Sequence, residues 1–513
     1  MAAIILKTTR TVNSSEMQPF YVAAIKYKID CFHGCLSDIH LHLSSNSRQK
    51  GHEDRWVSTE YYGGKSVVCL LTQLMIILGG LTWEPFANAC SFINLQLGST
   101  RLFYRNQLIY QKAVNSFFQR HMNQIRQSLK EKDIVAAVDV RYDTPGFSAN
   151  KATVVFLDTA SRKIFHFDAG DSQEVDRHSP RLEKHLVSKG LQFILTTQLQ
   201  VSEIVSDAST TIINLMASEF PQFIHSLDTW HKAKSIAKRL AETSKKAANK
   251  ELIPWIRKII NHFWYCCHVS KGSVDRLTRR WFGILYHVTN VHSWVTDRCR
   301  HRENEIIDNP SRSWLNKSST AYKNLRSIIT DKYFLGNLKY YTRCRQTWCI
   351  ENFYSHSLLK YCPKRIGFSF DGYVMRNQLA IIDYNHHTGR PALTNSQDEV
   401  CGMPQFSRKT KHWVAYERLV CKSYDYIPDL MSECMHHIYC ARNEDYKKGK
   451  RSLELDDIAP NLSGESNPET TSNLLKEMKR RKSEGKQYFY SESENAEWYP
   501  EYSFDGNVAL IAT

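Results

Sequence analysis

A change of hydrophobic periodicity at residue 133 constrains the fold of this chain more than any other feature. The stretch "DIVAAVDVRYD" is a nearly continuous apolar run that ends in charge, which is typical of a buried central strand. "ATVVFLD" and "IFHFDAG", joined by the turn "TASRK", predict a β-hairpin. Helices and strands then alternate through the strands "VSEIVSD" and "QFIHSLD". The predicted order, β-β-β-α-β-α-β-α, is an antiparallel meander followed by parallel α/β units, and we expect one mixed five-stranded sheet over residues 133–235.

The 513 residues are too many for a single core, and composition divides the chain further. The fold class expected is α/β for the core and α+β for the whole chain. The three helices before the sheet are either a helix-turn-helix with a DNA-reading third helix, "STRLFYRNQ", or an ordinary helical core. The expected segments are 1–60 (no clear structure), 61–130 (helical), 131–240 (first part of the α/β core), 241–345 (helical insertion rich in Trp, His and Arg), 346–440 (helical last part of the core) and 441–513 (disordered tail).

The charge balance indicates an anionic partner. Lys and Arg number 68 against 52 Asp and Glu, a formal net charge of +16, which favours nucleic acid first and an anionic membrane surface second. A basic surface that serves only solubility is the alternative. The apolar stretch "SVVCLLTQLMIILGGLTW" contains Gln73 and ends near a Gly pair, so we expect a buried helix and no membrane span.

Two further features concern the compartment. The scattered cysteines lack a disulfide framework and the N-terminus has no signal peptide, so we expect reduced thiols inside the cell. The basic runs "KKGKR" and "KEMKRRK" in the polar tail predict nuclear localisation, although a solvated charge run would look the same.

Three of the predicted strands end in an acidic residue, namely Asp139, Asp207 and Asp228. In α/β sheets, reactive groups gather at the carboxyl ends of the strands. Two carboxylates on neighbouring strand ends can hold Mg²⁺, and a metal pair about 4 Å apart would support phosphodiester cleavage. Any one of these Asp residues could instead be a turn or cap residue. The site would also need a third carboxylate, supplied by a helix.

The element order is that of the ribonuclease H-like fold, and five motifs carry a closer resemblance. They are "DVRYDTPGFSA", "SLDTWHKAKSI", "LIPWIRKIINHFWYC", "LLKYCPKR" and "RNQLAIIDYN", spread over residues 79–417. In this order they resemble cut-and-paste DNA transposases with an Asp-Asp-Glu core, and uncharacterised transposon-derived animal proteins of the Kolobok-like kind; the hAT-like and Mutator-like superfamilies are wider kin. The resemblance implies a nuclease and strand-transferase that uses two Mg²⁺ (or Mn²⁺) ions. It also implies transposon ends and target DNA as partners, a homo-oligomer and no small-molecule cofactor.

The resemblance assigns the first two catalytic carboxylates. The first falls on Asp139, with Asp143 as the alternative in a Thr-Pro-Gly turn, and the second falls on Asp207. Related chains follow the second Asp with Arg-His, whereas this chain has Ala208-Ser209. That departure keeps open a second interpretation, a domesticated and catalytically silent DNA-binding protein.

The third carboxylate is the least defined. The related pattern, aligned backwards from Lys360, places Asn352 at the Glu position, with Glu351 one residue earlier. Since one helical residue turns a side chain by about 100°, the two assignments aim at different places. We expect Glu351 to be the ligand. Glu303 and Glu305 are further alternatives.

The stretch "FIHSLDTWHKAKSI" carries the remaining candidates. The resemblance puts Asp228 and His231 at the rim of the metal site, in contact with DNA and not with metal. Lys232, Lys234 and, from the first motif, Arg141 would flank the DNA, unless they only form a solvated face. The string "WYCCHVSKG", with its neighbouring histidines, lacks a second ligand pair at zinc-finger spacing, so we expect no zinc finger there.

Overall fold

The computed structural model describes most of the chain between residues 65 and 441, together with short segments on either side. The described residues are 26–28, 38–42, 53–57, 61–62, 65–92, 97–144, 149–176, 178–300, 314–364, 366–407, 411–441 and 470–483. No helix within these ranges is both long enough and apolar enough to cross a membrane.

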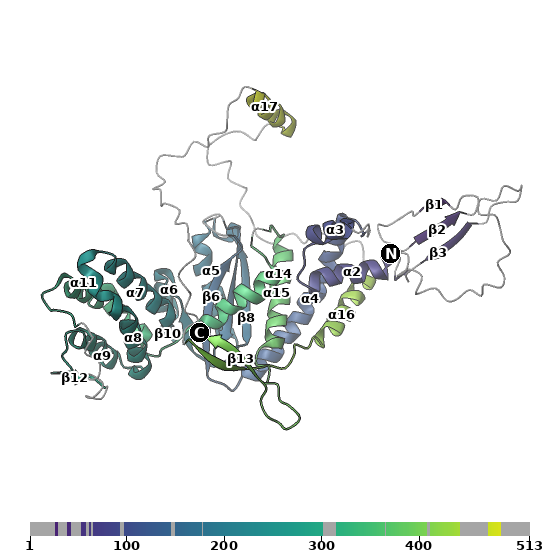
Figure 1. The fold of residues 1–513 in the computed structure, drawn as a ribbon. Coiled ribbons are helices and arrows are strands. Elements are labelled where there is room, and N and C mark those ends of the chain that lie inside the picture. Colours follow the sequence, from purple (N-terminus) through teal and green to yellow (C-terminus); the bar gives the residue numbers. More distant parts are fainter. Residues whose placement is uncertain are drawn as a thin grey trace, which may run out of the picture. The chain divides into compact units, whose positions relative to one another are not determined.

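A five-stranded mixed sheet lies at the core of the larger compact unit, and its strands are those that the sequence predicts (Figure 1). The spatial order is β10-β9-β6-β7-β8. Strand β6 pairs parallel to β9, and β9 parallel to β10, whereas β6-β7 and β7-β8 are antiparallel. The strands are β6 (Ile134–Tyr142), β7 (Lys151–Asp158), β8 (Ile164–Asp171), β9 (Val201–Ser206) and β10 (Ile224–Leu227).

Both faces of the sheet are covered, which explains the continuous apolar runs in its sequence. On β6, Ala136 and Val138 belong to one hydrophobic cluster, and Ala137 between them belongs to another. Helix α5 packs on the first face, and α15 with α4 on the second. The helices that follow the meander are α5 (Pro180–Thr196), α6 (Thr210–Glu219) and α7 (Thr229–Ser244), with a short 3₁₀ turn η1 (Ser172–Val175) before them.

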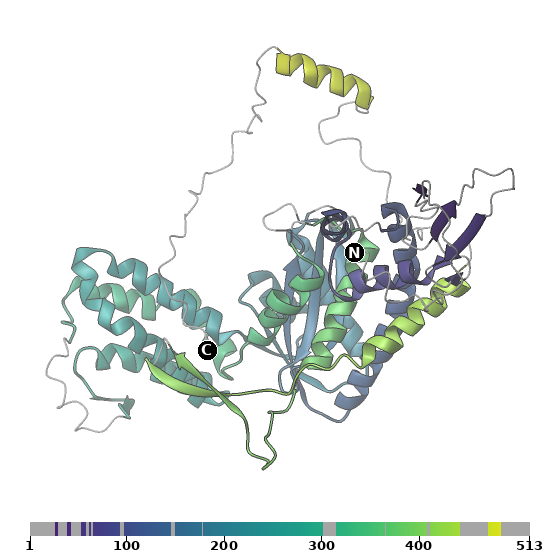
Figure 2. The same cartoon turned by 45° about the vertical axis from the view of Figure 1, so that its right-hand side comes forward.

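The three helices before the sheet share their core with two helices from near the C-terminus. Helix α4, thirty residues long, has buried side chains from Phe103 to Leu129 and packs against α15 and α16 (Figures 1 and 2). Because α4 has buried side chains along its whole length, the three helices fit the prediction of an ordinary helical core better than that of a helix-turn-helix whose third helix contacts DNA. The helices are α2 (Val67–Leu78), α3 (Trp83–Phe92), α4 (Thr100–Leu129), α15 (Phe370–His387) and α16 (Tyr426–Cys440).

The segment after α7 is a helical insertion with a hydrophobic core of its own. Trp255, Phe263 and Trp281 are fully buried in it, and Leu227 of the edge strand β10 joins the same cluster. The helices of the insertion are η2 (Ala247–Trp255), α8 (Ile256–Ser270), α9 (Val274–His287), α11 (Thr320–Ile329), α12 (Lys332–Asn337) and η3 (Leu338–Tyr341); its hairpin is β11 (Ser293–Trp294) with β12 (Asp297–Arg298). The chain returns through α13 (Trp348–Asn352), the π-helix η4 (Phe353–Leu358) and α14 (Leu359–Tyr361).

Some expectations about the outer segments are wrong. Residues 391–420 do not continue the helical core: they contain a hairpin of β13 (Gly402–Ser407) and β14 (His412–Glu417) and belong to a second compact unit. The expected disordered tail contains helix α17 (Thr471–Ser483), which includes all of "KEMKRRK". "KKGKR" lies outside the described residues. Before α2 the described strands are β1 (Lys26–Lys28), β2 (Asp38–His42), β3 (Glu53–Val57), β4 (Tyr61–Tyr62) and β5 (Lys65–Ser66).

Candidate active site

Asp139 and Asp207 are neighbours on the side of the sheet where the parallel strands β6 and β9 have their carboxyl ends. The parallel register of β6 and β9 pairs Ala137 with Val205; Asp139 lies two residues after Ala137 within β6, and Asp207 directly follows the last residue of β9. Neighbouring strands are about 4.8 Å apart, and the charge of Asp207 acts on the pKa of Asp139, so the two carboxylates are close neighbours. The prediction that β6 and β9 are neighbours in one mixed sheet is confirmed. The expectation that Asp139 ends its strand is wrong, because β6 pairs with β7 as far as Tyr142.

The environment of Asp139 and Asp207 disfavours the ionised form of both carboxyl groups. Burial raises the pKa of Asp139 to about 8, and the charges of Asp207, Glu183 and Glu351 act in the same direction. The backbone N–H of Val140, 2.8 Å from Asp139 Oδ1, opposes this only in part. Burial also raises the pKa of Asp207, again with a contribution from Glu351. Carboxylates that raise one another's pKa are the usual preparation for binding a cation.

Glu351 reaches this pair from the helix that follows the insertion. Its Oε1 lies 2.6 Å from His231 Nε2, and the same nitrogen lies 3.6 Å from Asp207 Oδ1. Asn352 is exposed, and within the described residues its side chain has no hydrogen bond to the site. The structure therefore turns Glu351, and not Asn352, towards the two Asp residues.

A π-helical stretch directly after Glu351 accounts for its position. Residues 353–358 form η4, in which each hydrogen bond spans one residue more than in an α-helix. A π turn contains one residue more than an α turn, so it changes the direction in which the residues before it face relative to those after it. Tyr354 in this stretch donates its hydroxyl hydrogen to the carbonyl oxygen of Asp139, at 2.6 Å. This hydrogen bond ties the helix that carries Glu351 directly to the strand that carries Asp139.

Asp228 is a structural residue at the start of α7. Its Oδ1 caps the helix by accepting the backbone N–H of His231 at 2.8 Å, as an N-cap residue does. Its Oδ2 accepts from the backbone N–H and the hydroxyl of Thr347, at 2.6 and 2.7 Å. The side chain is 2% exposed. Asp228 therefore positions both His231 and the segment that leads to Glu351.

A buried ion pair, which the sequence did not reveal, holds the same segment. Glu203 on β9 is 1% exposed and accepts a forked pair of hydrogen bonds from Arg345, of 2.7 to 3.1 Å. Ser226 on β10 donates to the same carboxylate at 2.5 Å. The carbonyl of Arg345 in turn accepts the N–H of Thr229. Residues 345–347 are thus fixed to two strands and the start of α7, only a helical turn before Glu351.

Glu183 on α5 is a fourth carboxylate near the site, also missed in the sequence. It accepts a hydrogen bond from Ser209 at 3.4 Å. Burial raises its pKa, and the charge of Asp207 adds to this. No sequence motif singles out Glu183, and only the fold brings α5 close to the strand ends.

The other predicted DNA-contacting residues divide by exposure. Arg141 is 7% exposed and donates to the carbonyl of Cys362 at 3.0 Å, so as placed it does not face DNA. Lys232 lies on the ring of Phe334, 4.2 Å from its centre, and burial lowers its pKa. Lys234 is exposed beside Trp230 and remains available. Asp143 follows the end of β6 and accepts a hydrogen bond from Thr144.

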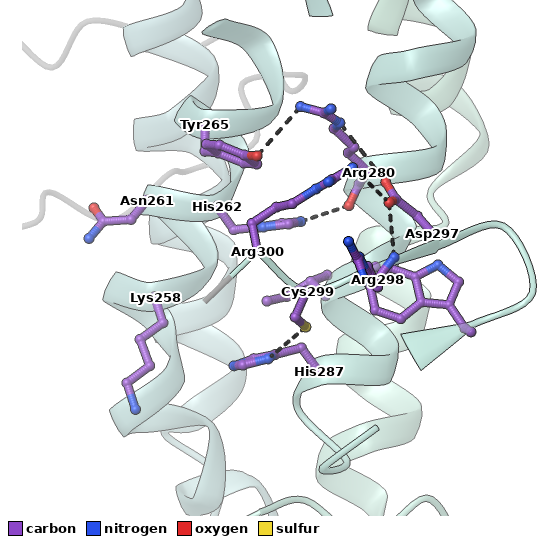
Figure 3. Close-up of a pocket in the computed structure, with 13 residues that line it drawn as sticks. Lys258, Asn261, His262, Tyr265, Arg280, His287, Asp297, Arg298, Cys299 and Arg300 are labelled. Carbon is purple, nitrogen blue, oxygen red and sulfur yellow. Dashed lines mark hydrogen bonds and ion pairs between the residues drawn. The ribbon is translucent and has the colours of Figure 1, made fainter. Parts of the chain in front are cut away.

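Two alternatives, Glu303 and Glu305, lie outside the described residues. A separate hollow of about 370 Å³ lies within the insertion, between α8, α9 and the β11-β12 hairpin (Figure 3). The cations Lys258, Arg280 and Arg298 line it, and no residue of the carboxylate site takes part.

The residues at the sheet edge fit a divalent cation. Asp207 Oδ1 is buried, and in the described part of the chain no donor forms a hydrogen bond to it. Carboxylate oxygens are the ligands that Mg²⁺ and Mn²⁺ prefer. Asp207, Asp228 and His231 can each place one ligand atom within 4.8 Å of the others. Both oxygens of Asp228 already accept hydrogen bonds, so it is poorly placed to coordinate a metal; Asp139 and Glu351 are the neighbouring carboxylates whose charges interact with the site.

Comparison with known proteins gives no assignment, since neither a family model nor a curated protein matches this chain.

Proposed function

We propose that this chain is a transposase or transposase-derived DNA nuclease and strand-transferase, with a ribonuclease H-like core. The observation that carries the proposal is the approach of Glu351 to Asp207 through a shared contact with His231, beside Asp139 on the neighbouring strand. Two parallel strand ends and a helix from beyond the insertion would then supply the three carboxylates of an Asp-Asp-Glu site. The net charge of +16 supports DNA as the substrate.

The three carboxylates would hold two Mg²⁺ or Mn²⁺ ions, which would activate an attacking hydroxyl and stabilise the leaving oxygen of a phosphodiester. The protein's own contribution is orientation. Tyr354 and the Asp228-Thr347 hydrogen bonds fix the helix of Glu351 relative to the strands. His231 contacts Glu351 in the absence of DNA and metal, and its Nε2 would become available to a phosphate oxygen once Glu351 binds a metal ion.

A second candidate is a catalytically silent DNA-binding protein. One observation favours it: Glu351 is engaged by His231 at 2.6 Å, which satisfies the carboxylate without a metal. The absence of the Arg-His pair after Asp207 points the same way. The two candidates share the basic surface and differ only in chemistry.

A supercoiled-plasmid nicking assay separates the two candidates. Wild-type protein should nick DNA only with Mg²⁺ or Mn²⁺, and Asp139→Asn, Asp207→Asn and Glu351→Gln should each lower the rate by more than about a hundredfold. Asn352→Ala and the exposed Glu242→Gln are matched controls that should keep wild-type rates.

DNA binding is measured in parallel by gel shift. Retained binding in the carboxylate variants supports a loss of chemistry alone. Metal-dependent nicking that survives in Glu351→Gln would exclude this residue as the third ligand. If wild-type protein binds DNA but does not nick it with either metal, the proposal fails and the silent DNA-binding protein is the better description.

A further inference from the structure

We propose a zinc site in the helical insertion, formed by His287, His292 and Cys299. Each residue offers one ligand atom, and the three atoms all lie within 4.8 Å of one another. His287 Nδ1 is 3.4 Å from Cys299 Sγ, a contact visible at the lower end of the hollow in Figure 3. All three side chains are half-buried, so an ion from solvent can reach them. The site is distinct from the carboxylates at the sheet edge.

The backbone brings the three ligands together by a tight turn and a hairpin. His287 is the last residue of α9, and Asn290 takes a left-handed conformation (φ 61°) in the turn that follows. The β11-β12 hairpin then folds back, and the N–H of Cys299 donates to the carbonyl of His292 at 2.8 Å. His292 and Cys299 are therefore held opposite each other at the open end of the hairpin.

Aromatic packing fixes the hairpin and the imidazole rings. Trp294 of the hairpin stacks on Tyr286, with ring centres 5.2 Å apart, and covers Gly283, where an added Cβ would lie 2.7 Å from the Trp294 ring. Trp314 contacts the rings of both His287 and His292, at 5.7 and 5.5 Å. Ligands whose side chains are restrained before binding lose little conformational entropy when an ion binds.

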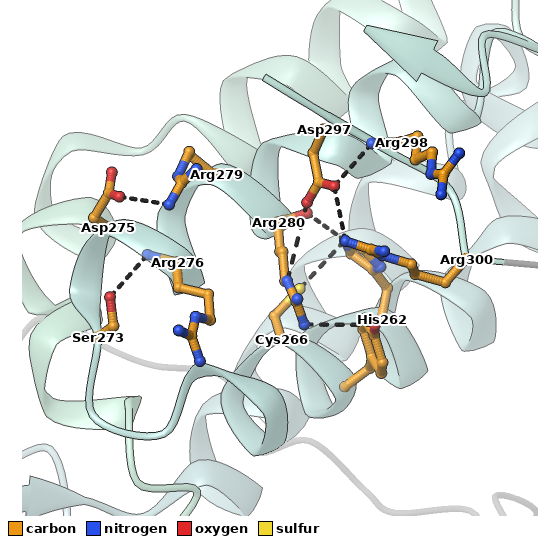
Figure 4. A network of polar contacts seen from close by, with 11 residues as sticks. His262, Cys266, Ser273, Asp275, Arg276, Arg279, Arg280, Asp297, Arg298 and Arg300 are labelled. Carbon is orange, nitrogen blue, oxygen red and sulfur yellow. Dashed lines mark hydrogen bonds and ion pairs between the residues drawn. The ribbon is translucent and has the colours of Figure 1, made fainter. Parts of the chain in front are cut away.

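Polar neighbours complete the environment that metal-binding histidines usually have. The amide oxygen of Asn290 lies 3.0 Å from His292 Nε2 and can accept a ring proton there, the kind of outer hydrogen bond that orients metal-binding imidazoles. Asp297 accepts from the backbone N–H of Arg298 and from Arg300, and contacts Arg280 of α9, so it anchors the hairpin to the helix (Figure 4).

Zinc is the ion that suits this donor set. Two imidazole nitrogens and one thiolate are typical of zinc sites, whereas Mg²⁺ takes oxygen ligands. On binding, the Cys299 thiol releases its proton to solvent and its sulfur coordinates as thiolate. Three ligands from the described residues leave a fourth position for another donor or for water.

A second His-Cys contact in the same insertion provides a contrast. His262 Nε2 lies 3.4 Å from Cys266 Sγ, but it also lies 2.8 Å from the carbonyl oxygen of Arg280 (Figure 4). Among the described residues, no third ligand approaches this pair closely enough to complete a group. In the described part of the insertion, a His lies next to a Cys at two places, but a third ligand completes the group only at His287, His292 and Cys299.

The metal content of the purified full-length chain, prepared without a histidine tag, tests the proposal. After dialysis against a weak chelator, mass spectrometry should find about one zinc per chain. Cys299→Ser and His292→Ala should each reduce this at least about tenfold. Cys344→Ser, a half-buried thiol elsewhere in the insertion, and Asp207→Asn, at the sheet edge, should retain it.

Cobalt substitution identifies the thiolate ligand directly. Co²⁺ added to metal-free wild-type protein should produce a thiolate-to-cobalt charge-transfer band, which Cys299→Ser should lose and Cys344→Ser should keep. If the Cys299 and His292 variants do not fold, chelator-driven zinc release from wild-type protein, followed by the same cobalt spectrum, serves instead. Wild-type protein without zinc and without a cobalt band, zinc that persists in the folded Cys299 and His292 variants, or copper or iron in place of zinc would overturn the assignment.

Discussion

Replacing Asp228 by Asn separates its positioning role from a role in metal binding. Asn is as good an N-cap as Asp, so the hydrogen bond from the His231 N–H survives. On the other side, the substitution places an amide NH₂ where Oδ2 now accepts from the N–H and hydroxyl of Thr347. The NH₂ group of the new Asn side chain would then face the N–H and the hydroxyl of Thr347, which are also donors. Because position 228 is only 2% exposed, water cannot replace the lost acceptor.

The expected loss follows from those two hydrogen bonds. A hydrogen bond to a charged group contributes about 1.5–3 kcal/mol, and two bonds to one oxygen are not additive, so we expect about 3 kcal/mol. One kcal/mol corresponds to about 2–4 °C in domains of 150–250 residues and to less in larger ones, which predicts a melting temperature lower by about 3–5 °C. The loss should be the same with and without Mg²⁺.

Differential scanning fluorimetry and hydrogen exchange measure the two consequences. Amides of residues 345–352 should exchange faster in Asp228→Asn, because their anchor at Thr347 is lost. Asp207→Asn is the control: it removes a repelled charge and no hydrogen bond, so its melting temperature should not fall. Wild-type melting and exchange in Asp228→Asn, or a loss seen only in the presence of metal, would refute the positioning role.

Three further predictions concern pH, the buried ion pair and the tail. Because the pKa of Asp139 is raised from 3.8 to about 8, metal-free protein should lose stability as the pH rises through that interval, and Asp139→Asn should remove this part of the pH dependence of the melting temperature. Arg345→Met removes the closest partner of the buried Glu203 charge and leaves only Arg343 at 3.8 Å, so it should cost about 3 kcal/mol in urea unfolding, and the double variant Glu203→Gln/Arg345→Met should cost less; equal losses would argue against the pairing. Deletion of residues 441–513 should reduce the nuclear fraction of a fluorescent fusion, and an unchanged distribution would remove the tail as the signal.

The sheet and its acidic edge are the parts that the sequence predicts well. Continuous apolar runs identify strands buried on both faces, and the order of elements restricts how they pair. Asp139 lies in the last half of β6 and Asp207 directly follows β9, and parallel neighbours bring the carboxyl ends of their strands to the same side of the sheet. The positions of these two residues can be predicted from local sequence, because each depends on the strand next to it in the chain.

The rest of the site depends on contacts that local patterns do not encode. Glu351 is aimed by a π-helical stretch, and no propensity distinguishes one π turn from an α-helix. The partner of Glu203 is Arg345, 142 residues away across the insertion. In the sequence, Arg141 cannot be distinguished from the exposed cations, and only the fold shows that it is buried against Cys362.

Binding of Mn²⁺, followed by electron paramagnetic resonance on the full chain, tests most directly whether the three carboxylates form a metal site. We predict about two Mn²⁺ per chain, with the spin coupling of neighbouring ions, in wild-type protein and in Cys299→Ser. The triple variant Asp139→Asn/Asp207→Asn/Glu351→Gln should lose both ions while retaining the fold, as checked by circular dichroism. Equal Mn²⁺ binding by the folded triple variant and by wild-type protein would contradict the account.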